Sequence, residues 1–363
     1  MRVLLDEQIF AIQPVGGISR MFAELAYSFA VGAPGGIDLL PFRTPIVNRY
    51  VLESETLRTA LNARQARNPW TALAADFADV KAEGTADVVH STFYLPHGLR
   101  VSSKSKRVVT VHDMIPELVP HFRRRLDLLT LKQRYVETAD QVICVSEATK
   151  QDLLKVYGLI KAPIHVVHHG VSPRFRPDVA KADILPKRYL LFVGHRHKYK
   201  DATVLFRAFG LLAHQEEDLE LLCIGGDKFT ADELTLFDEL GIQGRVKQRF
   251  MEDKFVPSAY AHAEAFIFPS HFEGFGLPAL EAMASGTPAI LARATSLPEV
   301  GGEAAVYFEP GDYRELADLI AQIVNSTVLR SSIVSQGLRR AREFDWRAAA
   351  DKTKKVYESA VGD

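Results

Sequence analysis

The sequence lacks several features that would place a protein in a particular class. It has only two cysteines, no pair spaced as Cys-x-x-Cys, and no run of about 18 apolar residues, the length that a membrane-spanning helix requires. Cys144 and Cys223 lie in apolar, strand-like runs, which predicts buried, reduced thiols. The net charge is −1, whereas a general nucleic-acid binder would carry a basic domain, so nucleic acid is not an expected partner.

The composition and the first residues indicate a soluble globular protein. Hydrophobic residues make up 47% and charged residues 25% of the chain, and 363 residues predict two domains at about 150 residues each. The start, MRVLLDEQIF, places Asp6 and Glu7 where a signal peptide would have its apolar core. We therefore expect a cytoplasmic protein, which could still rest on the inner face of the membrane.

Short apolar runs alternate with helix-length amphipathic segments in both halves of the chain. The runs predict strands at 2–5, 87–90, 107–111, 141–145, 164–167, 189–193, 219–224, 265–268 and 288–291. The amphipathic segments predict helices at 19–30, 126–139, 147–157, 202–214, 231–240, 277–285 and 313–325. This alternation indicates an α/β fold in which helices cover both faces of parallel sheets.

Residues 172–187, SPRFRPDVAKADILPK, interrupt the alternation with three prolines and no periodicity, so they are the best candidate for a linker. We expect two doubly wound domains, at 1–172 and 173–345. Ligands of such sheets bind outside the carboxyl ends of the strands. The expected site is therefore a cleft between the two domains.

The strongest motif is FPSHFEGFGLPALEAMA at 268–284, where a strand ends, a loop follows and a helix begins. Gly274 and Gly276 let the backbone approach a ligand closely. The first N–H groups of the helix, those of Phe275, Gly276 and Leu277, would bind an anion.

Two carboxylates flank this predicted anion site. Glu281, one turn into the helix, can accept ribose hydroxyls, and Glu273 can reach a sugar. The competing interpretation is a plain strand-to-helix turn with solvated glutamates, in which the glycines and both carboxylates would coincide by chance.

Arg196 and Lys200 follow the end of a predicted strand beside Gly194. Arginine can fork onto phosphate oxygens, and lysine supplies a compact charge. Such cations would bind a phosphate group and stabilise negative charge that grows on it in a transition state. The alternative is a solvated basic turn.

The order of these motifs resembles that of retaining glycosyltransferase family 4, a family with the GT-B fold. Glu273 and Glu281, with seven residues between them, resemble the family's Glu-x7-Glu signature, and 194–200 resembles its Gly-x-Arg-x-x-x-Lys diphosphate clamp. Further matches are Gly16-Gly17 (a glycine loop), His112-Asp113 (a strand-end histidine), Ser146-Glu147, 169–171, Gly225-Gly226 (the loop that meets the base), 295–299 and 344–346. The resemblance covers nearly the whole chain.

The resemblance implies two facing Rossmann-like domains, with the acceptor on the N-terminal one and the nucleotide-sugar on the C-terminal one. It also implies that a last helix, at about 346–363, packs back on the N-terminal domain. The implied catalytic residues are Glu273, His112, Arg196 and Lys200. The implied nucleotide-binding residues are Gly16, Gly17, Gly194, Arg196, Lys200, Gly225, Gly274, Phe275, Gly276, Leu277 and Glu281. A flexible turn at Gly16-Gly17, a tight turn at Gly225 and a structural His112 are the alternatives.

The chain has no Asp-x-Asp pair, with which many sugar transferases hold a divalent metal, so we expect no cofactor and a metal-free diphosphate site. A metal site among His165, His168, His169, His195 and His197 is disfavoured, because no carboxylate or cysteine stands at a ligand spacing beside them. The resemblance is to bacterial enzymes of surface-polysaccharide synthesis. It favours GDP-mannose as the donor, then a UDP-sugar, with a saccharide or lipid-linked saccharide as the acceptor.

Residues 121–135, HFRRRLDLLTLKQRY, interleave basic and apolar side chains. This stretch could sit on anionic lipid near a lipid-linked acceptor, or form an ordinary surface helix with core-facing leucines. Two other functions also stay open. A catalytically silent subunit would bind the sugar-nucleotide without transferring it, and an epimerase of similar fold would isomerise the donor alone.

Overall fold

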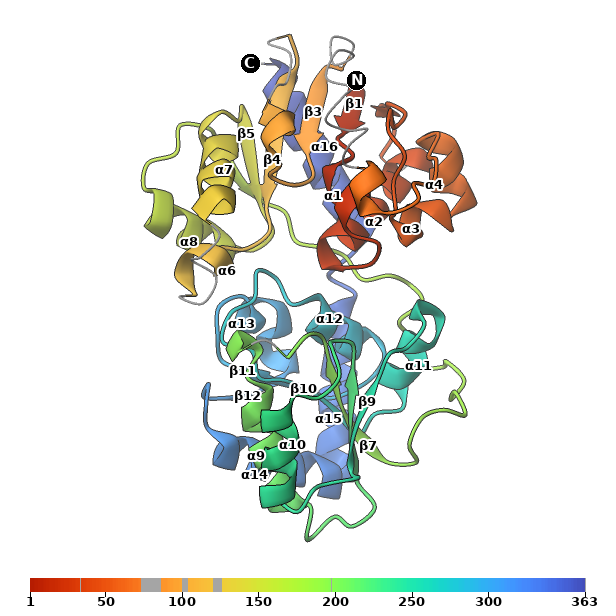
Figure 1. Cartoon of the computed structure of the whole chain (residues 1–363), viewed down its shortest axis with the longest axis vertical. Coiled ribbons are helices and arrows are strands. Elements are labelled where there is room, and N and C mark those ends of the chain that lie inside the picture. The colour runs from red at the N-terminus through yellow and green to blue at the C-terminus, as the bar shows by residue number, and fades with distance from the viewer. Residues whose placement is uncertain (33, 73–85, 100–103, 120–125, 197, 363) are drawn as a thin grey trace. The chain divides into compact units, whose positions relative to one another are not determined.

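The computed structural model describes the chain except residues 33, 73–85, 100–103, 120–125, 197 and 363. It divides into two compact units. Unit 1 is Met1–Gly170 with Asp345–Asp363, and unit 2 is Val171–Phe344. Each unit contains one six-stranded parallel sheet (Figure 1).

The sheet of unit 1 has the strand order β2-β1-β3-β4-β5-β6. In that order the strands are Asp38–Leu39, Arg2–Leu5, Val88–Ser91, Lys106–Val111, Gln141–Cys144 and Ile164–Val166. All residues of β3 and β5 are buried, as expected for central strands covered on both faces.

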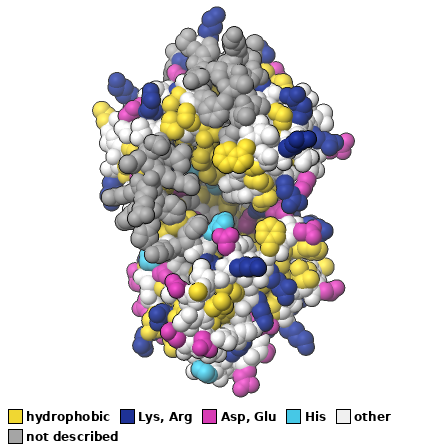
Figure 2. Space-filling view, in the orientation of Figure 1, with side chains coloured by type: hydrophobic (Ala, Val, Ile, Leu, Met, Phe, Trp, Pro, Cys, Tyr) yellow, Lys and Arg dark blue, Asp and Glu magenta, His cyan; other side chains and the backbone are white. Residues whose placement is uncertain are grey.

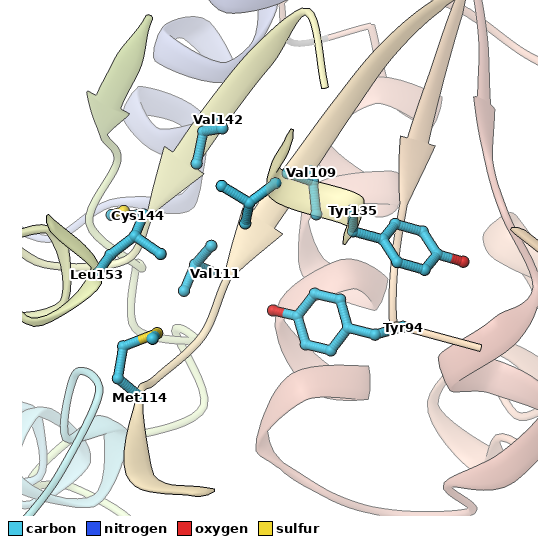
Figure 3. Packing of buried hydrophobic residues seen from close by; sticks show 9 residues of the cluster. Tyr94, Val109, Val111, Met114, Tyr135, Val142, Cys144 and Leu153 are labelled. Carbon is cyan, nitrogen blue, oxygen red and sulfur yellow. The ribbon is translucent and has the colours of Figure 1, made fainter. Parts of the chain in front are cut away.

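Helices cover both faces of this sheet. The described helices of unit 1 are α1 (Gln8–Ile12), α2 (Gly17–Ala30), α3 (Arg49–Leu52), α4 (Glu55–Ala60), η2 (Pro96–Leu99), α6 (Ile115–Leu118), α7 (Leu126–Glu137), α8 (Glu147–Tyr157) and α16 (Trp346–Gly362). Side chains of α7 and α8, including Tyr135 and Leu153, pack on Val109, Val111 and Val142 of the sheet (Figure 3). On the other face α16 packs against β3, β4, β5 and α2 (Figure 1).

The sheet of unit 2 has the strand order β12-β11-β10-β7-β8-β9. In that order the strands are Val306–Phe308, Ala289–Ala292, Ala265–Phe268, Tyr189–Val193, Glu220–Ile224 and Val246–Arg249. The helices are η4 (Lys198–Lys200), α9 (Ala202–Leu212), α10 (Ala231–Glu239), η5 (Asp253–Phe255), α11 (Val256–Ala261), α12 (Leu277–Ala284), α13 (Leu297–Gly301), η6 (Gly302–Ala304), α14 (Tyr313–Asn325) and α15 (Thr327–Ala341). The predicted α/β class with two parallel sheets is confirmed.

The segment 172–187 differs from the predicted linker. It belongs to unit 2 and is hydrogen-bonded to α11. Ser258 donates to the carbonyl of Ala180 (2.8 Å) and accepts from the N–H of Ala182 (2.9 Å). The prolines therefore mark an irregular segment fixed to the domain surface, and unit 2 already begins at Val171.

Both cysteines are free and buried, as predicted, and burial raises the pKa of each thiol to about 12. No helix in the described part of the chain is long and apolar enough to cross a membrane. Figure 2 shows basic and acidic side chains interspersed on the face in view, in keeping with a net charge of −1.

Candidate functional site

Two loops at the carboxyl edge of the unit 2 sheet carry many of the predicted site residues. Strands β7 and β10 are parallel neighbours, so the loops 194–201 and 269–276 that follow them lie at the same edge. The N–H of His271 donates to the carbonyl of Tyr199 (2.8 Å), and the His271 ring lies 2.8 Å from a carboxylate oxygen of Asp201. These bonds fix the two loops to each other.

Lys200 and Glu273 form an ion pair between these loops. Lys200 Nζ lies 2.7 Å from Glu273 Oε1, and the side chains are only 15% and 11% exposed. The ammonium also lies 5.0 Å from the ring centre of Phe268, at the end of β10. A cation and a carboxylate predicted to act on one substrate are therefore held in direct contact.

The loop that carries Glu273 is braced by the segment before α13. Thr295 accepts a hydrogen bond from the N–H of Glu273 (2.9 Å), and Ser296 donates to the carbonyls of Glu273 (3.0 Å) and Phe275 (2.9 Å). Thr295 adopts a φ of 44°, which is rare for a β-branched residue. Both supporting residues belong to the motif TSLPE at 295–299, which the family resemblance had marked in the sequence.

Gly276 starts α12 in a conformation that favours glycine. Its φ is +105°, and a Cβ there would lie 2.9 Å from a methyl carbon of Leu297. Pro278 occupies the first turn, as predicted. The N–H of Leu277 belongs to the helix start, where backbone donors lack intrahelical partners and the helix dipole is positive. The geometry suits an anion at this end of the helix.

Two predicted residues of this segment have buried side chains. Phe275 is 4% exposed and packs edge-on against Phe344. Its side chain is therefore part of the core, and only its backbone N–H can take the predicted role in anion binding. Glu281 is 5% exposed, and its carboxylate accepts a hydrogen bond from the hydroxyl of Tyr260 on α11 (3.1 Å). Tyr260 thus fixes the carboxylate predicted to bind ribose.

Arg196 is held against α10. Its Nε donates to Glu233 Oε1 (2.7 Å), and its Nη2 donates to the carbonyl of Asp227 (2.6 Å). The guanidinium lies 4.7 Å from the ring centre of Phe229, and the side chain is 5% exposed. Within the described part of the chain its buried Nη1 has no hydrogen-bond partner. This nitrogen is a donor that an anion could satisfy.

The structure places the predicted loop 225–226 beside Arg196. A Cβ on Gly226 would lie 3.2 Å from Arg196 Nη1, and Gly226 has a φ of +70°. The N–H of Gly194 donates to Ile224 of the neighbouring strand (2.9 Å), so both loops start at the same edge. The two predicted clamp cations contact different carboxylates, Arg196 that of Glu233 and Lys200 that of Glu273.

Glu233 is a site residue that the motifs did not identify. It forms a capping box with Thr230, because its N–H donates to the Thr230 hydroxyl (3.2 Å) and its Oε2 accepts from the Thr230 N–H (2.7 Å). The capping box can be recognised in the sequence as Thr-x-x-Glu. The contact with Arg196, 37 residues away, depends on the tertiary fold.

In unit 1, His112 follows β4 and is 8% exposed. Its buried Nε2 has no hydrogen-bond partner among the described residues. Burial lowers the pKa of His112 well below its usual value, and the charges of His169, His90 and Lys132 act in the same direction. A hydrogen bond to the backbone of Thr92 opposes them. The ring is therefore neutral at pH 7, and its Nε2 can accept a hydrogen bond from a hydroxyl.

Gly16 and Gly17 begin α2 in unit 1. A Cβ on Gly16 would collide with the amide group of Gln13, whose Oε1 accepts from the N–H of Ser19 (3.0 Å). A side chain at position 16 would therefore displace the Gln13 amide from its bond to Ser19. A Cβ on Gly17 would meet no atom within 4 Å, which leaves space beside this loop.

The interpretation of residues 121–135 as a basic surface stretch is wrong for Lys132. Lys132 is not on a solvated face, because it is 5% exposed and paired with Glu117 (2.8 Å). Arg134 is exposed, whereas residues 121–125, with Arg123, Arg124 and Arg125, lie outside the described residues. Contact of this stretch with a membrane stays a prediction.

The predicted histidine cluster has non-metal contacts. His165 lies 2.8 Å from the side-chain oxygen of Gln141, and His169 stacks on Trp346. His197 is not among the described residues. In the part of the chain that is described, no group of three His, Cys, Asp or Glu residues could hold a metal ion.

Comparisons with known proteins identify the family and the fold. Residues 15–175 match the family model "Glycosyltransferase Family 4", and residues 177–340 match "Glycosyl transferases group 1". An O-antigen chain mannosyltransferase B of Escherichia coli is 28% identical over 282 residues, which cover 73% of this chain and 72% of the relative. An MMP α-(1→4)-mannosyltransferase of Mycolicibacterium hassiacum is 29% identical over 387 residues, which cover 95% and 93%.

Solved structures share the fold. A sucrose-phosphate synthase from Thermosynechococcus elongatus superposes with a TM-score of 0.76 at 22% identity, covering 99% of this chain and 98% of that one. WaaG, a glycosyltransferase involved in lipopolysaccharide biosynthesis, superposes with a TM-score of 0.71 at 15% identity, covering 98% and 99%. Two family models that follow one another along the chain, and two Rossmann-like units, lead to one conclusion: the chain is a glycosyltransferase of family 4 with the GT-B fold.

Proposed function

We propose that this glycosyltransferase moves a sugar from a nucleotide-sugar to a saccharide or lipid-linked saccharide, with retention of configuration and without a metal. The observation that carries the proposal is the contact between Lys200 and Glu273 at the start of α12. In this proposal Lys200 supplies a cation for a phosphate, Glu273 accepts sugar hydroxyls, and the start of α12, four residues after Glu273, supplies backbone donors. GDP-mannose is the favoured donor, because the two relatives described above are named mannosyltransferases, and a UDP-sugar is second.

The diphosphate would bind in unit 2 to Arg196, Lys200 and the first N–H groups of α12. Among the described residues Arg196 Nη1 finds no partner, and Lys200 can exchange its Glu273 contact for a phosphate oxygen. These charges are already in place before the reaction, so they would stabilise the departing diphosphate without reorganisation. Glu281, fixed by Tyr260, would accept the ribose hydroxyls, and the loops at Gly194 and Gly225 would border the nucleotide.

Glu273 would hold hydroxyls of the transferred sugar. The acceptor hydroxyl would form a bond to the anomeric carbon on the face from which the diphosphate departs, and the departing phosphate oxygen would take the acceptor proton. This route needs no covalent enzyme intermediate. Unit 1 would bind the acceptor beside the Gly16-Gly17 loop, and His112 would accept a hydrogen bond from a substrate hydroxyl through its Nε2.

The test is turnover with defined donors. The protein is incubated with GDP-mannose or UDP-glucose, with and without oligosaccharide and polyprenyl-linked saccharide acceptors, and release of the nucleoside diphosphate is measured. We expect acceptor-dependent release that EDTA leaves unchanged and a product with the anomeric configuration of the donor. Binding without release would indicate the silent subunit, and an isomerised sugar without acceptor would indicate an epimerase. Either result would refute the proposal.

A further inference from the structure

A buried ion pair in unit 1 lies outside the residues assigned so far. Lys132 Nζ on α7 lies 2.8 Å from Glu117 Oε2 on α6, and the two side chains are 6% and 5% exposed. The other carboxylate oxygen of Glu117 accepts from the hydroxyl of Tyr157 on α8 (2.9 Å). Because burying two charges costs desolvation free energy, such a pair adds little stability compared with apolar residues of the same volume. Its presence needs another explanation.

Lys132 is also bonded to the turn that follows β4. Its ammonium donates to the carbonyl oxygen of Asp113 (3.0 Å). The carboxylate of Asp113 accepts from the N–H of Ile115 (3.0 Å), the first residue of the helix that carries Glu117. One ammonium therefore connects the beginning of the turn, at Asp113, with Glu117 in the helix that follows it.

The residue just before Asp113 is His112, and Lys132 also approaches the strand that carries it. The ammonium lies 5.7 Å from the ring centre of Tyr94, and the Tyr94 hydroxyl donates to the carbonyl of Thr110 (2.8 Å). Figure 3 shows Tyr94 beside β4 and Met114 just past its end. After His112, the Asp113 carbonyl is thus bonded to Lys132 itself. Before it, the Thr110 carbonyl is bonded to Tyr94, whose ring Lys132 approaches.

We infer that Lys132, fixed by Glu117 and Tyr157, is a positioning residue that orients His112 for sugar transfer. The inference rests on the proposed function, because it requires that His112 Nε2 meets a substrate hydroxyl. A misplacement of about 1 Å in a reacting group can lower a rate by about 10²-fold. Loss of Lys132 removes a side-chain donor from the Asp113 carbonyl, next to His112.

The test separates positioning from stability by comparing single and double variants. Lys132→Met leaves the buried Glu117 carboxylate without its cation, so we expect it to lower both Tm and kcat. The double variant K132M/E117Q removes both charges and should regain much of the Tm. It still lacks the donor to Asp113, so we expect its kcat to stay at least about 10-fold below wild type. The Kd for GDP should not change, because the proposed diphosphate ligands lie in unit 2.

Two further variants complete the experiment. Lys106→Met is the matched control. Lys106 starts β4, the strand that ends just before His112, and its side chain is about one-third exposed and pairs with Asp140 at 3.5 Å. It should keep the wild-type kcat. Lys132→Arg keeps the charge and the donors and should retain most of kcat. Tyr157→Phe, which removes one hydroxyl, should give a smaller fall in kcat and keeps the test decisive if the double variant does not fold.

The outcomes distinguish this inference from the proposed function. A double variant with wild-type kcat, a Tyr157→Phe variant with wild-type kcat, or an equal fall in Lys106→Met would overturn the positioning role while transfer by the wild type stands. A wild-type protein that transfers no sugar would refute the proposed function itself, and the inference with it.

Discussion

Lys200 Nζ and Glu273 Oε1 lie 2.7 Å apart, at the point where the loops after β7 and β10 meet. A phosphate that binds Lys200 must compete with this carboxylate. The pair therefore couples the proposed diphosphate site to the proposed sugar site, and its two members should respond differently to substitution.

Glu273→Gln keeps the shape of the side chain and removes its charge. Because Lys200 loses its ionic partner, we expect GDP to bind at least as tightly as to wild type, while kcat falls by about 10²-fold or more. Isothermal titration gives the Kd, and single-turnover transfer gives the rate. Glu252→Gln, at a carboxylate 63% exposed, is the control. Weaker GDP binding together with a normal kcat would reverse the roles given to the pair.

Glu233→Ala should weaken nucleotide binding through Arg196, because Arg196 Nε loses its acceptor at 2.7 Å. The change also removes half of the capping box of α10, which costs about 0.5–2 kcal/mol of stability. Thr230→Ala weakens the same cap without touching Arg196. We expect the two variants to lose similar Tm, but only Glu233→Ala to raise the Kd for GDP. Equal Kd values in both would show that Glu233 acts on the helix alone.

Gly276→Ala should destabilise unit 2 and disturb the helix start. A side chain at φ +105° costs about 1–2 kcal/mol, and the new Cβ would lie within 2.9 Å of the Leu297 side chain. Urea unfolding measures the loss, and the GDP titration should show weaker binding because the first N–H groups of α12 shift. Gly311→Ala, with φ +89° and no atom within 4 Å of the added Cβ, is the matched control, with strain but no clash. If both variants bind GDP equally well, the start of α12 does not contact the nucleotide.

Acid should weaken unit 1 through its buried histidines, among them His90 and His169. Burial lowers the pKa of His90 and of His169 to about 3, whereas the unfolded chain has a pKa near 6.5. The unfolded state then binds more protons between these values, so stability is complete above about pH 6.5 and falls as the pH drops toward 3.

His90 also bonds Tyr357 of α16 (2.6 Å) and Thr110 of β4 (2.7 Å), so its protonation should loosen the last helix. Urea unfolding at pH 8 and pH 5.5 tests this for wild type and His90→Gln. The variant should be less stable at pH 8 but lose less stability on acidification. An equal loss of stability between pH 8 and pH 5.5 in both proteins would show that protonation of His90 does not cause it.

Much of the fold was predictable because apolar runs and caps act locally. Ser146 accepts from the N–H of Thr149 (3.0 Å) and starts α8 at Glu147, as its position in the sequence predicts. Strand β9, Val246–Arg249, was missed because Lys247, Gln248 and Arg249 break the apolar pattern. As an edge strand it pairs on one side only, with β8, and tolerates polar side chains.

The site was predictable where its chemistry lies within one motif, and not where partners come from distant segments. The contacts of Arg196 with Glu233 and of Lys132 with Glu117 join different elements, so spacing along the chain carries no signal for them. Lys132 looked like part of a solvated basic face because burial of a charge depends on its partner. Its buried position is visible only in the fold.

Binding of GDP and UDP to wild type and to the double variant R196A/K200M tests the central claim most directly. If unit 2 binds the diphosphate through these two cations, titration calorimetry should give a measurable Kd for wild type with at least one nucleotide. Loss of two charge-assisted contacts of about 1.5–3 kcal/mol each should weaken that binding by 10²-fold or more. Equal affinity in the variant, or no binding of either nucleotide to wild type, would contradict the assignment of this site.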